Sequence, residues 1–143
     1  MSKYPFVMGS NVIAFKKNGI NYAMTCAWAQ MIGYDKIMML IGSQSDTGKA
    51  LKQGDVVGVS ALSSDQNKIS NFIGSKHSTK VDKFKDINYT LVDNAILIDG
   101  AKTQSICEVK EILHLSGIEE DNLVILDIKK IDDDKKKDFL LFP

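Results

Sequence analysis

The amino-acid sequence predicts a mainly β domain of the barrel type with two or three short helices. Many short β-prone segments follow one another with turn signals between them, which is typical of a barrel. Only two short segments have helical spacing, and no long helix separates the strands as a doubly wound fold would require. The 143 residues suit one domain, residues 1–143, and can bury a core without disulfides.

The strands are predicted from apolar runs and the turns between them. Segments 11–15 and 20–25 flank Asn18-Gly19, which is a strong hairpin signal. The continuous apolar run 36–42 predicts a strand that is buried on both faces. Further strands are expected at 55–62, 89–92, 95–99, 105–113 and 123–129.

Two helices are expected, each ended by glycine. The first would run through residues 50–53, capped by Ser45 or Asp46, and stop at Gly54. The second would run from 66 to 73 and stop at Gly74. The apolar tail 139–142 would be an exposed patch on an isolated monomer, so we expect it to dock on the barrel or to contact another subunit.

Composition narrows the functional classes. The formal net charge is zero, so no overall field favours nucleic acid or an anionic membrane. All 18 basic residues are lysine, so an anion site must use ammonium groups, hydroxyls and backbone N–H groups. Cys26 and Cys107 make no disulfide framework, and no signal peptide or membrane-length apolar run is visible, so we expect a cytoplasmic protein.

The loop 42–49 is a candidate phosphate site. It carries three hydroxyls, two glycines and Lys49, and it follows an apolar strand. It is not a P-loop, because Ala50 stands where that motif requires Ser or Thr. A simple capped turn explains the same residues. The hydroxyl-rich loop 75–80 is a second candidate for facing a phosphate, or else a solvated surface loop.

Residues 24–28, Met-Thr-Cys-Ala-Trp, are a candidate ligand wall. Their small and hydroxylated side chains let a planar ligand approach the backbone, although these residues by themselves favour core packing of Trp28 as the alternative. Cys26 has no histidine or acid near it in sequence, which favours a packed or ligand-lining thiol over a nucleophile. The acidic clusters 119–121 and 132–134 are expected to be solvated turns.

Four segments in order resemble the flavin reductase-like family, whose fold is a split barrel that binds flavin. The family has a Met-Thr-Ala-Ser-Trp-like motif after a conserved Asn, and this chain has Asn21-Tyr22-Ala23-Met24-Thr25-Cys26-Ala27-Trp28. Its phosphate loop corresponds to 43–47 and its Leu-Ser-x-x-Gln segment to 62–66, followed by Phe72. Its Asp-Lys-Phe loop corresponds to 82–84, so the resemblance spans roughly residues 6 to 130.

The resemblance implies positions for a bound FMN. Met24, Thr25, Cys26, Ala27 and Trp28 would lie along the ring or the ribityl chain. Ser60 and Ala61 would approach the ring. The phosphate would be received and covered by residues from two loops, namely Ser43, Ser45, Thr47, Lys49, Ser75, Lys76 and Lys80.

The resemblance also implies a function, namely hydride or electron transfer from NAD(P)H through FMN to an acceptor, by a homodimer. Reductase members often carry a histidine in the stretch that corresponds to 116–123, and this chain has none there. An FMN-binding electron carrier or sensor without turnover is therefore the alternative. A split barrel of the pyridoxamine-phosphate oxidase type is a weaker one, since the chain lacks arginine. The short chain favours FMN over FAD.

Overall fold

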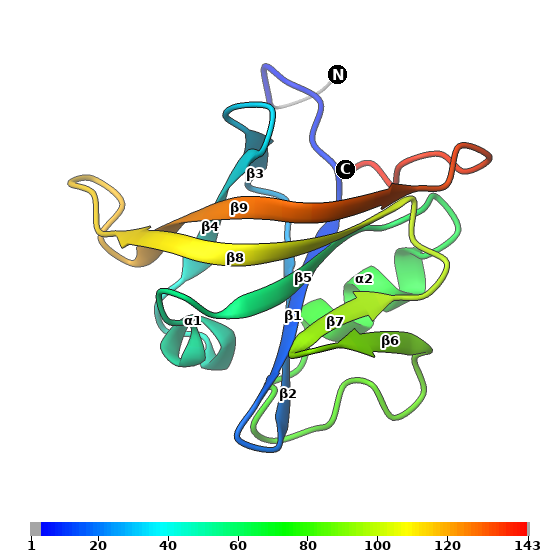
Figure 1. Cartoon of the computed structure of the whole chain (residues 1–143), viewed down its shortest axis with the longest axis horizontal. Helices are drawn as coiled ribbons and strands as arrows, with labels where there is room; N and C mark the ends of the chain where they lie inside the picture. The colour runs from blue at the N-terminus through cyan, green and yellow to red at the C-terminus, as the bar shows by residue number, and fades with distance from the viewer. Residues whose placement is uncertain (1–3, 143) are drawn as a thin grey trace.

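Nine strands form one antiparallel sheet in the computed structural model, which describes residues 4–142 (Figure 1). They are β1 (Asn11–Lys17), β2 (Ile20–Cys26), β3 (Ala29–Met31), β4 (Lys36–Gly42), β5 (Val56–Ala61), β6 (Tyr89–Val92), β7 (Ala95–Ile98), β8 (Thr103–Leu113) and β9 (Asp121–Asp133). The neighbour order is β3-β4-β9-β8-β5-β1-β7-β6, and β2 pairs with β1. Helices α1 (Asp46–Ala50) and α2 (Asn67–Gly74) complete the described part. The prediction of a mainly β fold with short helices is confirmed.

The first hairpin forms where the sequence predicts it. Strands β1 and β2 pair from Asn11 with Cys26 to Lys17 with Ile20. The turn residues Asn18 and Gly19 have φ values of 51° and 77°. Two successive positive φ values suit a tight hairpin turn, and Asn-Gly is the pair that tolerates them best. The turn therefore fixes the register that carries β2 to its end at Cys26.

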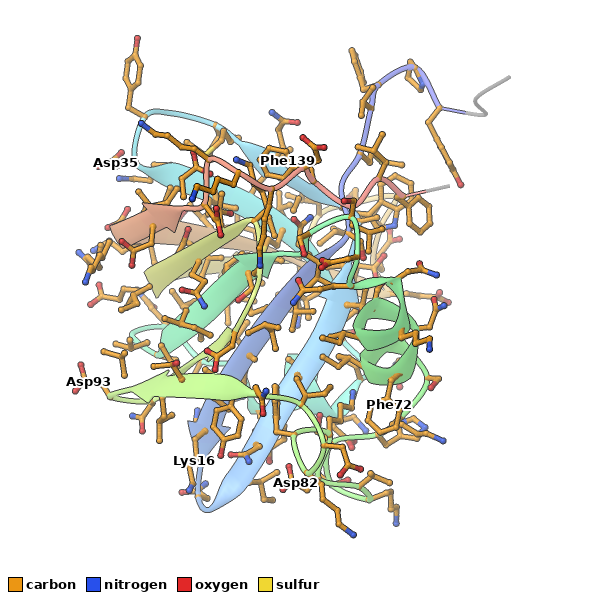
Figure 2. The ribbon with its side chains drawn as sticks, turned by 90° about the vertical axis from the view of Figure 1, so that its right-hand side faces the viewer. Lys16, Asp35, Phe72, Asp82, Asp93 and Phe139 are labelled. Carbon is orange, nitrogen blue, oxygen red and sulfur yellow. The ribbon has the colours of Figure 1, made fainter. Side chains whose placement is uncertain are left out.

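The outer edge of β2 is covered by side chains instead of another strand. Ala23 donates its backbone N–H to Ser78 Oγ at 3.1 Å. Its carbonyl accepts from Lys83 Nζ at 2.7 Å and from Ser78 Oγ at 3.3 Å. Figure 2 shows α2 beside this strand, with Asp82 in the loop that continues past them. These bonds satisfy the backbone groups of Ala23, which an uncovered edge would leave unpaired.

Two apolar clusters hold the sheet together. One gathers side chains from the strands near α1, including Phe15, Met39 and Leu126. The other packs Ile73 of α2 against β1 and β7, through residues such as Ile96. Complete burial of such a side chain stabilises the fold by about 1.5–3 kcal/mol. The apolar face of α2 thus anchors the helix to the sheet, while its polar face stays outside the core.

Helix α1 begins earlier than expected. The sequence places a helix at 50–53, whereas the structure has it at Asp46–Ala50 with Ser45 as the N-cap. The Ser45 hydroxyl accepts the N–H of Gly48, and the backbone at Leu51 is already extended. Capping therefore decides where α1 starts. Helix α2, at Asn67–Gly74, lies within one residue of its predicted bounds.

Strand β4 has the expected bounds but not the expected burial. Its residues alternate between buried and half-buried, so only one face lies in the core. The other face, with Met38 and Leu40, lines an apolar cavity. The short strand β3 beside it was not predicted. Strand β9 extends to Asp133, into the predicted charged turn, because it pairs with the long strand β8.

The C-terminal tail docks on the sheet. Leu140 donates its N–H to the carbonyl of Leu62, and its own carbonyl accepts from Ser10. Phe142 donates to the carbonyl of Met8. The tail thus lies against both the start of the chain and the end of β5. Neither helix within residues 4–142 has the length and apolar character needed to cross a membrane.

Candidate functional site

A cavity of about 600 Å³, here called the main cavity, lies between the end of β2, helix α2 and the C-terminal tail. Residues 24–28 form one side, and Ser70, Asn71 and Gly74 of α2 form another. Residues 140–142 line a third. Small-molecule sites usually measure about 300–1,000 Å³, so this cavity has the size of a ligand site.

A smaller cavity of about 190 Å³, here called the side cavity, adjoins the main cavity. Met24, Thr25 and Gly74 line both. The rest of its wall comes from Ala23 of β2, Ile73 of α2, residues 45–47 at the start of α1, and the segment after α2. The two cavities therefore lie next to each other along β2 and share part of their walls.

Most of the predicted site residues line one of these two cavities. The main cavity has six of them, namely Met24, Thr25, Cys26, Ala27, Trp28 and Ser75. The side cavity has Ser45, Thr47 and Lys76, in addition to the shared Met24 and Thr25. The structure therefore brings together, across more than fifty positions of sequence, the β2 segment and the two loops that the sequence singled out.

The other predicted residues lie outside both cavities. The Ser43 hydroxyl donates to the carbonyl of Glu120 at 2.8 Å. Ser60 is fully buried, and its hydroxyl accepts the N–H of Ile98 at 3.0 Å. Three more residues are placed elsewhere, namely Ala61 in the β1–β5–β8 ladder, Lys49 on the exposed side of α1, and Lys80 on an exposed loop. Sequence order alone could not show which way these side chains point.

Thr25 occupies the junction of the two cavities. Its hydroxyl donates to the carbonyl of Ser70 at 2.9 Å, which ties β2 to α2. Alternate residues of a strand turn their N–H and C=O groups to the same side, so those of Thr25 point away from β1, as those of Ala23 do. A heterocycle with polar edge atoms can therefore meet a backbone donor and a backbone acceptor at Thr25.

Cys26 contributes a neutral thiol to the main cavity. Burial raises the pKa of this thiol to about 11, and the Asp121 carboxylate adds to the rise. The thiol donates to the carbonyls of Trp28 and Leu40 at 3.3 and 3.4 Å, and such bonds favour the protonated thiol. A thiol that stays protonated at neutral pH is a poor nucleophile, so Cys26 is a lining residue.

Trp28 is half exposed, at 52%, and not part of the core. Its ring meets the edge of the Tyr4 ring, with centroids 5.9 Å apart and planes at 83°. The alternative that Trp28 packs in the core is therefore wrong. Trp28 also lines an apolar cavity of about 860 Å³, which shares Ala27, Trp28 and Leu40 with the main cavity.

The side cavity is lined by cationic and hydroxyl groups. Lys76 and His77 come from the loop after α2, and Lys83 lies further along the same segment. Lys83 is only 3% exposed, and its ammonium donates to the carbonyls of Ala23 and Ile73 at 2.7 and 2.8 Å. Burial lowers the pKa of this ammonium, and Asp46 opposes that shift. No carboxylate within residues 4–142 forms a salt bridge with it.

The carboxylate of Asp46, which lines the side cavity, already accepts two hydrogen bonds from Thr79. Asp46 Oδ2 accepts both the hydroxyl and the N–H of Thr79, at 2.7 and 3.0 Å. These bonds lower the pKa of Asp46. Ser45 also has an internal role, since its hydroxyl donates to the carbonyl of Gly42 at 2.7 Å and caps α1. The loop is thus a capped turn that also lines the side cavity, and the chemistry of this cavity suits an anion of phosphate size.

Sequence reasoning missed several residues of these cavities. Lys83 stands inside the Asp-Lys-Phe segment of the family resemblance, which was the available signal. Asp121 was assigned to a solvated acidic turn, but it lines the main cavity. The tail residues 140–142 were expected to dock, yet no pattern indicated that they line the same cavity as residues 24–28.

Comparisons with known proteins agree with this arrangement. The family described as flavin reductase like domain matches residues 4–142, nearly the whole chain. No curated protein sequence matches the chain at a significant level. Among solved structures, the NADH:FAD oxidoreductase of Streptomyces globisporus has a TM-score of 0.86 at 18% identity, over 96% of this chain and 82% of that one. A second structure of that oxidoreductase, in complex with NAD and FAD fragments, has a TM-score of 0.85 at 17% identity, over 96% of this chain and 81% of that one.

An FMN-binding protein from Thermus thermophilus with bound p-hydroxybenzaldehyde is also similar. Its TM-score is 0.81 at 14% identity, over 94% of this chain and 81% of that chain. At such identities the likeness concerns the fold alone. The match to the family, in contrast, covers the β2 segment, both loops and the tail that line the cavities, and the chain therefore belongs to the flavin reductase-like domain family.

Proposed function

We propose that the chain binds FMN across the main and side cavities and moves hydride or electrons from NAD(P)H through it to an acceptor. The observation that carries the proposal is that the two cavities adjoin at Thr25, which lines both of them. A polar and aromatic wall suited to a ring there adjoins a pocket whose Lys76 and Lys83 suit a phosphate. The family membership and the flavin-binding neighbours support flavin as the ligand.

In this arrangement the protein residues bind, orient and shield. The backbone groups of Thr25 pair with the polar edge of the ring, and Lys76 and Lys83 offset the phosphate charge. Trp28 and the tail residues 140–142 limit the access of water to the ring. Bound flavin accepts a hydride and passes on its electrons, so no protein nucleophile is required.

FMN fits better than FAD as the resident flavin. The side cavity, at about 190 Å³, has room for a phosphate group but not for a second nucleotide. The neighbouring proteins include one described as an NADH:FAD oxidoreductase and one described as FMN-binding, so both flavins occur on this fold. The nicotinamide donor is proposed from the first of these neighbours.

Binding is tested by spectroscopy and titration. The purified protein should show the visible bands of bound flavin, or take up added FMN with a change in its fluorescence. The Lys76→Ala variant should weaken FMN binding about tenfold and leave riboflavin, which has no phosphate, unchanged. Lys85→Ala, in the same segment but outside both cavities, should change neither. A colourless protein that takes up neither FMN nor FAD contradicts the proposal.

Turnover is tested separately. Steady oxidation of NADH or NADPH by the FMN-loaded protein supports the reductase assignment. Tight FMN binding without such oxidation favours the electron carrier or sensor, an alternative consistent with the lack of histidine in residues 116–123.

We also propose a homodimer. Phe6, Val7 and Leu141 are 79%, 82% and 59% exposed, and Phe6 and Val7 line the apolar cavity beside Trp28. An exposed apolar surface of this kind is typical of a protein interface. Sedimentation at micromolar concentration should give twice the chain mass, and a monomer would contradict the proposal.

A further inference from the structure

Asp121 presents a carboxylate to the main cavity. It is the first residue of β9 and pairs with Gly42 at the end of β4. A Cβ atom built on Gly42 would lie 3.8 Å from Asp121 Oδ1, so the carboxylate lies over this glycine. Its backbone N–H donates to the carbonyl of Ile118, which fixes the turn that leads into β9.

The charge of Asp121 has no counterpart in the main cavity. Among the described residues that line this cavity, Asp121 alone has a side chain that is charged at neutral pH. The ammonium groups of Lys76 and Lys83 line the side cavity instead, together with the carboxylate of Asp46, which accepts two hydrogen bonds from Thr79. The charged side chains that line the two cavities therefore differ in net sign. This difference orients a ligand with its anionic end in the side cavity.

The field of Asp121 reaches the wall formed by residues 24–28. Burial is the main cause that raises the pKa of the Cys26 thiol, and the negative charge of Asp121 raises it further. A rise of this kind means that the carboxylate disfavours a negative charge placed at Cys26. The same field acts on any group that gains negative charge within the main cavity.

We propose that Asp121 lowers the reduction potential of the flavin ring held in the main cavity. The inference rests on the proposed function. Hydride transfer breaks a C–H bond of the reduced nicotinamide and forms a bond to hydrogen on the ring, leaving the donor as its oxidised cation. The ring receives two electrons and one proton, so its net charge becomes one unit more negative. A carboxylate that lines the same cavity opposes that charge.

The effect is measured as a ratio of affinities. Reduction by dithionite needs no turnover, so the affinities for oxidised and reduced FMN are measured directly on each variant. Asp121→Asn should tighten the binding of reduced FMN relative to oxidised FMN by about five- to tenfold. For a two-electron couple, tenfold corresponds to about 30 mV in midpoint potential.

Matched variants separate charge from structure. Glu120→Gln removes the same charge from the adjacent exposed residue, which does not line the main cavity, and should change the ratio less than twofold. Asp121→Glu keeps the charge and should keep the wild-type ratio. Asp121→Ser repeats the test with a second neutral side chain, in case the Asn variant folds poorly.

Two outcomes overturn the inference, and they are distinguishable. If the wild-type protein binds FMN and both neutral variants keep its ratio of affinities, Asp121 does not set the potential, although the proposed function stands. If the wild-type protein binds no flavin in either redox state, the proposed function fails and the inference fails with it.

Discussion

The buried ammonium of Lys83 donates to the backbone carbonyl of Ala23 at 2.7 Å and so fastens the loop after α2 to the edge of β2. The same ammonium donates to the carbonyl of Ile73 near the end of α2. One side chain therefore joins a strand, a helix and a loop around the side cavity. Because Ala23 lies two residues before Thr25, this contact also positions the junction of the two cavities.

Replacing Lys83 should weaken both the fold and the site. Lys83→Met keeps the length of the side chain but leaves the carbonyls of Ala23 and Ile73 without a charged donor. We expect a loss of about 2–4 kcal/mol in the free energy of unfolding, measured by urea denaturation. The exposed Lys85→Met should lose less than about 0.5 kcal/mol. Equal stability of the two variants would show that the Lys83 contacts make no net contribution to the free energy of unfolding.

Gly48 should tolerate no side chain. A Cβ atom at this position would lie 2.1 Å from the carbonyl oxygen of Gly42, and that backbone cannot move without disturbing β4. Gly48→Ala should therefore cost about 2–3 kcal/mol in the free energy of unfolding and should weaken FMN binding, because the same turn lines the side cavity.

Gly33→Ala is the matched control for that variant. Its Cβ atom would meet the Lys36 side chain at 3.7 Å, an ordinary contact, so stability and binding should stay near wild type. Wild-type stability of Gly48→Ala in the same denaturation series would contradict the close approach of the two backbones.

The β architecture could be predicted because its signals are local. The Asn18-Gly19 turn depends only on neighbours in sequence, and the hairpin of β1 and β2 formed as expected. The strand expected at 105–113 is likewise present, within β8. The start of α1 was harder to place, since Ser45 and Asp46 are both good caps, and only the bond from Gly48 decides between them.

The candidate site depends on contacts that sequence order does not reveal. Ser60 in β5 and Thr47 in α1 are both buried hydroxyls, yet Ser60 bonds to β7 and Thr47 lines the side cavity. Asp121 resembles its exposed neighbours Glu119 and Glu120, and only its pairing with Gly42 turns it to the main cavity. Which side chains share a cavity is set by long-range strand pairing, which single residues do not encode.

The two cysteines should resist modification in the native protein. Burial raises the pKa of Cys26 to about 11 and that of Cys107 to about 12, so the reactive thiolate is scarce at pH 8. A thiol-reactive dye should label neither cysteine in the native protein at pH 8 and both after denaturation. Cys26→Ser should keep FMN binding, because a hydroxyl can also donate to the carbonyls of Trp28 and Leu40. Rapid labelling of native Cys26 would contradict the assignment of a neutral thiol.

Acid should destabilise the protein in part through Asp127. Its carboxylate lies 2.6 Å from Lys36 Nζ and 3.4 Å from Lys110 Nζ, on the β4–β9–β8 part of the sheet. The hydrogen bond from Lys36 is the main cause that lowers the pKa of Asp127, with Lys110 adding to it. Because the pKa is lower in the folded than in the unfolded state, the ionised carboxylate contributes stability above the unfolded value of about 3.9. That contribution is lost as the pH falls from about 4 through the folded value.

Urea denaturation of wild type and Asp127→Asn over a range of pH measures this contribution. The difference in the free energy of unfolding should be constant between pH 5 and 7 and should shrink below about pH 4, as wild-type Asp127 is protonated. Asp35→Asn removes the other carboxylate beside Lys36, which is 70% exposed at the side chain, and should have little effect at any of these pH values. A difference between wild type and Asp127→Asn that stays unchanged down to pH 3 would mean that the ion pair with Lys36 does not stabilise the fold. In that case the role of Asp127 would be limited to packing between β4 and β8.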